Sequence, residues 1–179
     1  MASEKDDWKR LTGGPVFDWI PEPLPSVMSE YLESELQAAL SQGEDPLRIH
    51  DYLADERARQ FRDDPAFRER VKEHIKTAGV TTFGSTLISF GSENPQGWHG
   101  ILEAVRRIQT YVDAADWLSK ALTPEDVHAD GVSILLQIED TSALDGSIDR
   151  LTELYDFGVR TVQLTYSSRN LVGDGCAER

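Results

Sequence analysis

The stretch Val132–Ile138 (VSILLQI), followed at once by Glu139 and Asp140, decides the fold. It is apolar almost throughout, which is typical of a parallel strand buried on both faces. A carboxylate at the end of so apolar a strand is costly to bury unless it is paired or bound to a metal. Glu139 is therefore a candidate metal ligand. The alternative is that Glu139 or Asp140 caps a helix that starts near residues 142–144.

Strand-like and helix-like segments alternate along the rest of the chain. Besides Val132–Ile138, the pattern predicts strands at residues 14–20, 80–90 and 159–166. Apolar residues at helical spacing predict helices between the strands. These helices run from residue 26 to a stop at Gly43, over 45–62, from 64 to Gly79, over 98–118, from 123 to about 131, and from 144 to Gly158.

A strand followed by a helix, repeated four times, predicts parallel βαβ units. A complete (β/α)8 barrel has eight such units and roughly 250 residues. We therefore expect an α/β fold in which residues 1–179 form one incomplete domain, a partial TIM-like barrel of about the first four units. The runner-up is a small open parallel sheet. A half-barrel exposes two strand edges, and such edges can pair with a second copy of the chain, so a homo-oligomer is possible.

The charge balance disfavours two classes of partner. The 179 residues contain 18 Lys and Arg against 32 Asp and Glu, a formal net charge of −14. Such a surface repels phosphate backbones and anionic lipid, so we expect neither a nucleic-acid nor a membrane partner. No apolar run approaches the ~18 residues of a membrane span, and residues 1–10 lack the apolar core of a secretory signal. We expect a soluble, cytoplasmic protein.

Lysine is scarce and cysteine nearly absent. Five of the 18 basic residues are lysine and thirteen are arginine. Abundant carboxylates with little lysine are typical of a protein from a high-salt cytoplasm, although an ordinary acidic protein fits equally well. The single cysteine, Cys176, excludes a disulfide within the chain and a cysteine-based zinc cluster. We expect its thiol to be buried or inert rather than nucleophilic.

Functional residues of parallel α/β folds gather where the strands end. Here that rule selects residues 18–22, 89–94, 139–140 and 166–178. In the last of these segments, Tyr166 and Asn170 are candidates for contacting a substrate. Their alternative role is hydrogen bonding within the loop.

Three segments carry a family resemblance: residues 134–140 (ILLQIED), 158–166 (GVRTVQLTY) and 170–176 (NLVGDGC). The first two, with the helix between them, resemble the middle of the membrane (renal) dipeptidase family, and the third resembles its microbial branch. The likeness runs from about residue 79 to residue 179 and rests on the order and separation of the segments. The resemblance implies a zinc metallopeptidase on an amidohydrolase-like barrel, of which this chain looks like the N-terminal half.

The same resemblance implies a site and a substrate. Glu139 matches the family's glutamate that bridges two zinc ions, giving one carboxylate oxygen to each cation. A metal-activated hydroxide would then cleave the peptide bond of a small peptide. Tyr166 stands where many members have a substrate-binding histidine, as it often does in the microbial branch.

Several positions depart from the family pattern. Ile20 and Glu22 stand where a His-x-Asp metal pair is usual after the first strand, and Asp140 replaces a glycine. Two further histidine ligands of the family belong to strands beyond Arg179. The alternative reading is therefore a non-catalytic remnant or interaction module with the same half-barrel fold. A weaker third reading is an amidohydrolase relative that acts on another amide.

The four histidines do not restore the missing ligands. His128 and Asp130 imitate a His-x-Asp pair, but they precede the third predicted strand and so belong at the opposite end of the sheet. His50 and His74 lie in charged helical segments, where we expect them to be solvated. His99 follows Trp98 at a helix start, where packing is the expectation and substrate contact the alternative.

Overall fold

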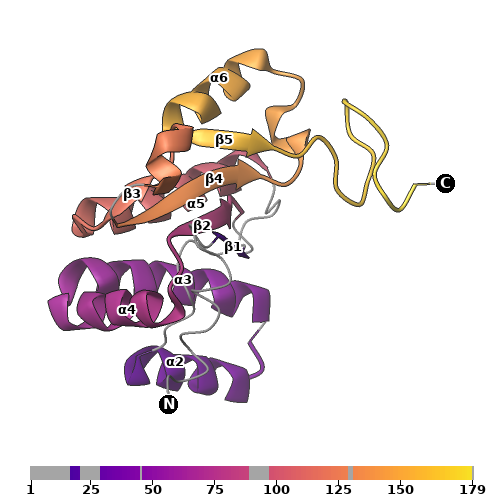
Figure 1. The fold of residues 1–179 in the computed structure, drawn as a ribbon. Coiled ribbons are helices and arrows are strands. Elements are labelled where there is room, and N and C mark those ends of the chain that lie inside the picture. The colour runs from indigo at the N-terminus through magenta and orange to yellow at the C-terminus, as the bar shows by residue number, and fades with distance from the viewer. Residues whose placement is uncertain (1–16, 21–28, 45, 89–96, 129–130, 179) are drawn as a thin grey trace, which may run out of the picture.

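The computed structural model describes residues 17–20, 29–44, 46–88, 97–128 and 131–178. Within these residues the chain forms a five-stranded sheet with helices packed around it (Figure 1). The strands are β1 (Phe17–Ile20), β2 (Thr82–Thr86), β3 (Leu118–Lys120), β4 (Val132–Ile138) and β5 (Val159–Val162). Every pairing among them is parallel. The predicted α/β class with a parallel sheet is therefore confirmed.

The central strand is β4, which is the VSILLQI segment. On one side it pairs with β2, which in turn pairs with β1. On its other side β4 pairs first with β3, Leu118 lying opposite Val132, and then with β5, Val162 lying opposite Ile138. The four longer strands thus cross the sheet in chain order, β1-β2-β4-β5, as consecutive βα units do.

The helices come from segments with clear start and stop signals. They are α2 (Glu30–Ser41), α3 (Pro46–Asp63), α4 (Pro65–Ala78), α5 (Trp98–Ala114) and α6 (Ile148–Phe157), with 3-10 turns η2 (Pro124–His128) and η3 (Thr141–Leu144). Asp64 caps α4 by accepting from the Ala66 and Phe67 amides at 2.9 and 3.1 Å, and Gly79 ends it at φ 69°. Figure 1 shows α6 beside β5, and α2, α3 and α4 grouped below the sheet, where α3 contacts α2, α4 and α5. No helix of the described residues is long and apolar enough to cross a membrane.

The two faces of the sheet differ in chemistry. Phe83, Ile134 and Leu136 are at most 1% exposed and belong to the main hydrophobic cluster, together with Ile101 and Ile108 of α5. The alternate positions of β2 and β4 carry two polar pairs. The hydroxyls of Thr82 and Ser133 lie 2.9 Å apart, and the Gln137 amide donates to Thr86 Oγ1 at 2.6 Å. Strand side chains alternate between faces, so these pairs share the face opposite the apolar cluster.

Several element boundaries differ from the sequence-based expectations. The helix predicted to reach residue 118 ends at Ala114, and Leu118 lies in the short strand β3. The strand expected over residues 80–90 spans Thr82–Thr86, and that expected over 159–166 ends at Val162. Residues 14–16 and 89–90 of the predicted strands lie outside the described residues. The missed strand is explained by Leu118 itself, whose seven-residue spacing from Tyr111 continues the apolar face of α5.

Candidate functional site

The candidate site lies where β4 and β5 end. Because these strands are parallel and Ile138 is paired with Val162, the segments that follow them leave the same edge of the sheet. One segment is Glu139-Asp140, and the other is the long loop of residues 163–178, which extends past β5 in Figure 1. The candidate segments after β1 and β2, including Glu22 and residues 89–94, lie outside the described residues.

Glu139 directly follows the last residue of β4 and is half-buried. It stands two residues beyond Gln137, the position that continues the polar face of the sheet. Among the described residues, no hydrogen bond or ion pair engages its carboxylate. The side chain is therefore free to accept a ligand at the rim of the sheet. Its role as a metal ligand stays a prediction.

Asp140, the next residue, makes the local hydrogen bonds. Its carboxylate accepts from the Ser142 amide at 2.5 Å, the Tyr166 amide at 3.1 Å and the Asn170 side-chain amide at 3.3 Å. Burial opposes its ionisation, but these hydrogen bonds outweigh burial and hold the pKa of Asp140 below the usual aspartate value. The capping role that the sequence left open between two carboxylates thus belongs to Asp140, at the start of η3.

Both the nitrogen and the oxygen of the Asn170 side-chain amide form hydrogen bonds at the loop. Its nitrogen donates to the Leu164 carbonyl at 2.8 Å and to Thr141 Oγ1 at 3.2 Å, besides Asp140. Its oxygen accepts from the amides of Val172 and Gly173 at 2.8 and 3.2 Å. The structure therefore shows the role within the loop that the sequence gave as an alternative. A substrate contact by Asn170 stays a prediction and requires these bonds to rearrange.

Tyr166 is fixed by its backbone and free at its ring. Its amide donates to Asp140 Oδ2 and its carbonyl accepts from the Cys176 amide at 2.8 Å. The residue is 48% exposed, and within the described part of the chain its hydroxyl has no hydrogen-bond partner. A phenol held in this way can donate to or accept from a bound molecule, so substrate contact by Tyr166 stays a prediction.

The donor set is incomplete for a metal site. Within the described ranges, no group of three or more His, Cys, Asp or Glu side chains lies close enough together to hold an ion. Ile20, where the family resemblance expects histidine, ends β1, and its side chain has no donor atom. Glu139 alone does not fit a zinc pair, which needs several ligands for each ion. We therefore assign no reaction step to a metal in this chain.

The remaining candidate ligands lie elsewhere. His74 is exposed on α4 as expected, but His50 on α3 is partly buried rather than solvated. His99 does not pack: its side chain is 81% exposed, with Nε2 3.3 Å from Glu103 Oε1. The side chain of His128 and all of Asp130 lie outside the described residues, and Cys176 is exposed on the C-terminal loop.

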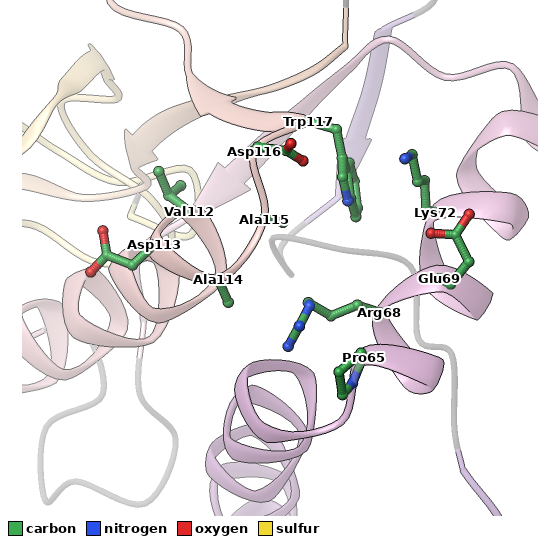
Figure 2. Close-up of a pocket in the computed structure, with 10 residues that line it drawn as sticks. All are labelled: Pro65, Arg68, Glu69, Lys72, Val112, Asp113, Ala114, Ala115, Asp116 and Trp117. Carbon is green, nitrogen blue, oxygen red and sulfur yellow. The ribbon is translucent and has the colours of Figure 1, made fainter.

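A cleft of about 540 Å³ lies between α4 and the turn from α5 into β3. Figure 2 shows Lys72 and Trp117 on its wall, and the Lys72 ammonium lies 5.9 Å from the Trp117 ring centroid. Trp117 precedes β3, so the cleft opens at the edge of the sheet where strands begin, away from Glu139. Sequence reasoning missed it because its lining comes from two segments that are at least 40 residues apart.

Comparison with known proteins gives a fold. No protein-family model matches the sequence, and no curated protein was found to match it. Among solved structures, an amidohydrolase from Pseudomonas aeruginosa matches 62% of this chain and 34% of its own, with a TM-score of 0.53 and 20% identity. A dipeptidase, described as a metallopeptidase of family M19, matches 86% of this chain and 43% of its own, with a TM-score of 0.50 and 18% identity.

These matches define the class of the fold. The described residues share the parallel α/β architecture of structures solved for two hydrolases, an amidohydrolase and a metallodipeptidase. The resemblance to the membrane dipeptidase family, drawn from residues 134–176, is confirmed at the level of the fold. This chain spans less than half the length of either structure.

Proposed function

We propose that this chain is part of a metal-dependent hydrolase that cleaves a peptide bond in a small peptide. The observation that carries the proposal is the position of Glu139. It is a half-buried carboxylate directly after the central strand of a parallel sheet, with no ion-pair or hydrogen-bond partner among the described residues. The fold is shared with an amidohydrolase and a metallodipeptidase. Functional groups in parallel α/β folds stand at this edge.

The scaffold of the proposal is a partial (β/α)8 barrel. Two features support it: β1, β2, β4 and β5 cross the sheet in chain order, and all are parallel. The polar pairs Thr82–Ser133 and Thr86–Gln137 would then line the inner face of the barrel, while the apolar face meets the helices. Glu139 would stand at the rim above these pairs.

In this proposal Glu139 supplies one ligand of the metal. Zinc is the metal that the family resemblance implies, and when bound it would supply a nucleophilic hydroxide at neutral pH. The part of this chain's own residues is to hold the ion and to position a small peptide. Tyr166 offers a hydroxyl for that purpose, and Asn170 shapes the loop that carries it.

The proposal also covers the location and the partners of the protein. A net charge of −14 supports a protein that works without nucleic acid or an anionic membrane surface. We include a cytoplasmic location in the proposal, with a small peptide as the partner. Association of two copies through the open edges of the sheet is also part of it, because the described residues leave the outer sides of β1 and β5 unpaired.

A second candidate function is a non-catalytic module with the same fold. It is favoured by the donor set: the described residues hold no group of three metal donors, and Ile20 replaces the expected histidine. A protein of this kind would keep the sheet and the loops at its edge but would bind no ion.

Zinc binding by the whole chain separates the two functions. The metal proposal predicts that the purified chain retains zinc after dialysis, measured by plasma mass spectrometry, and that Glu139→Gln lowers the retained zinc at least tenfold. Glu153→Gln, at an exposed position on α6, is the matched control and should retain zinc as the parent does. A well-folded parent that holds no more zinc than Glu139→Gln would support the non-catalytic module.

A further inference from the structure

The two loops at the candidate site are joined by a small set of partly buried hydrogen bonds. Asp140 accepts from the Tyr166 amide and from the Asn170 side chain. Next to it, Thr141 Oγ1 donates to the Leu164 carbonyl at 2.8 Å. Asp140 and Thr141 are 5% and 6% exposed, so these bonds are shielded from water on the side of β4. We call these contacts between residues 140–141 and residues 164–170 the rim latch.

The segment that the latch holds is stiff in its own right. The Cys176 amide donates to the Tyr166 carbonyl at 2.8 Å, and the Ala177 amide donates to the Ser167 carbonyl at 3.0 Å. A Cβ at Gly175 would lie 2.4 Å from backbone atoms of Ser167, so the chain can pass there only without a side chain. The loop is therefore held together by its own bonds, and the latch adds to the backbone bond from the Gln163 amide to the Ile138 carbonyl that joins its start to β4.

Within the latch, Asp140 has a role that its capping bond does not require. A cap needs one acceptor for the Ser142 amide, and Oδ1 provides it. The other oxygen, Oδ2, accepts from the Tyr166 amide, 26 residues farther along the chain. The second bond adds nothing to the start of η3, but it fixes the backbone from which the Tyr166 ring projects.

We propose that Asp140 is a positioning residue of the candidate site, whose carboxylate sets the place of Tyr166 relative to Glu139. The residue touches no substrate in this role and acts through the Tyr166 backbone. The inference rests on the proposed function for its purpose, because Tyr166 needs a fixed place only if the site binds a molecule. The latch itself is measurable without any metal or substrate.

Substitutions at Asp140 can separate positioning from capping. Asp140→Asn and Asp140→Ser both retain an oxygen that can accept from the Ser142 amide. Neither retains an acceptor for the Tyr166 amide, since asparagine presents an NH₂ group there and the serine hydroxyl is too short. Asp140→Ala removes both roles. Asp145→Asn is the matched control, because Asp145 is exposed at the end of η3 and asparagine tolerates its φ of 49°.

Amide hydrogen exchange in the full chain, read by NMR, tests the inference. We expect the Tyr166 amide to exchange at least tenfold faster in Asp140→Asn and Asp140→Ser, with the melting temperature close to that of the parent. Asp145→Asn should leave the Tyr166 amide protected. If either serine or asparagine at position 140 gives a folded protein with unchanged Tyr166 exchange, the inference is overturned. The serine variant keeps the test decisive if the asparagine variant does not fold.

A second measurement distinguishes this inference from the proposed function. Zinc is added to the chain while the ring signals of labelled Tyr166 are followed. Glu139→Gln should abolish the response to zinc and keep the Tyr166 amide protected, whereas Asp140→Ser should retain zinc and lose the ring response. No response in the parent would count against the proposed function alone. An unchanged ring response in Asp140→Ser would count against positioning.

Discussion

At the scale of single residues, neighbouring carboxylates take different roles because their surroundings differ. Glu139 and Asp140 are adjacent, yet Asp140 is saturated with hydrogen bonds while Glu139 has no partner among the described residues. The glycine that the resembling family usually has at position 140 could make none of the side-chain bonds of Asp140. The bonds that Asp140 adds to the rim latch therefore depend on the aspartate of this chain.

A buried arginine offers the clearest prediction at this scale. Arg107 on α5 contacts Asp55 Oδ1 at 2.8 Å and Asp51 Oδ1 at 3.2 Å, and its side chain is 10% exposed. Arg107→Met removes the contact of Arg107 with the buried Asp51, so we expect a loss of about 3 kcal/mol of unfolding free energy. That figure is at the low end for a buried pair, because Asp55 is 47% exposed. Urea denaturation measures the loss.

Arg106→Met is the matched control for this loss. Arg106 contacts the same Asp55 oxygen at 2.8 Å, but its side chain is 62% exposed. An exposed ion pair contributes about 0.2–1 kcal/mol, so this variant should stay close to the parent. Equal losses from the two variants would show that burial of Arg107 does not set the strength of its ion pairs.

At the scale of secondary structure, the sequence predicted the elements that carry their own signals. The apolar run VSILLQI predicts a buried strand, and the structure confirms it as β4. The predicted helix ends at Gly79 and Gly158 are confirmed, each with a left-handed backbone. β3 was missed because it is three residues long and follows α5 without a glycine or proline. The cue at Leu118 was ambiguous, since one leucine fits both a helix face and a strand.

The candidate site was less predictable than the elements. Its positions after β4 and β5 follow from strand order, which the alternation of strands and helices predicts. The bonds of Asp140 to Tyr166 and Asn170 join residues 26 and 30 positions apart. Such contacts depend on the register of β4 against β5, including the irregularity between Leu136 and Gln137, and no local pattern encodes that register.

The end of α6 gives a prediction at the scale of the element. Gly158 has φ 103°, and a Cβ there would lie 3.0 Å from Lys120 Cδ and 3.1 Å from Leu122 Cδ2. Gly158→Ala should therefore cost about 3 kcal/mol, from backbone strain together with overpacking against β3. Thermal and urea unfolding measure the cost.

Gly43→Ala provides the comparison. Gly43 also has a positive φ, 76°, but a Cβ there would meet nothing within 4 Å. Its cost should be about 1 kcal/mol, from the left-handed backbone alone. The difference between the two variants thus isolates the packing of the α6–β5 turn against Lys120 and Leu122. If Gly43→Ala costs as much as Gly158→Ala, the close contacts at Gly158 contribute nothing.

At the scale of the whole molecule, charge is the dominant feature. Thirty-two acidic residues against 18 basic ones give a pI near 4.6, and at neutral pH the carboxylates repel one another across the surface. Salt shortens the range of that repulsion, from about 10 Å at 0.1 M to about 3 Å at 1 M. The same screening would be required before two copies could approach through the open edges of the sheet.

The hypothesis of a high-salt origin predicts a strong stabilisation by salt at neutral pH. Between 0.05 and 1 M NaCl we expect the melting temperature to rise by roughly 5–10 °C, corresponding to about 2–3 kcal/mol for a chain of this size. Calorimetric scans at pH 7 measure the rise.

The control is the same titration near pH 4.6, where the net charge is close to zero and repulsion no longer opposes folding. There the rise should be small, because what is left is the general effect of salt on apolar burial. A rise of equal size at both pH values would assign the stabilisation to that general effect, and the acidic surface would then be that of an ordinary acidic protein.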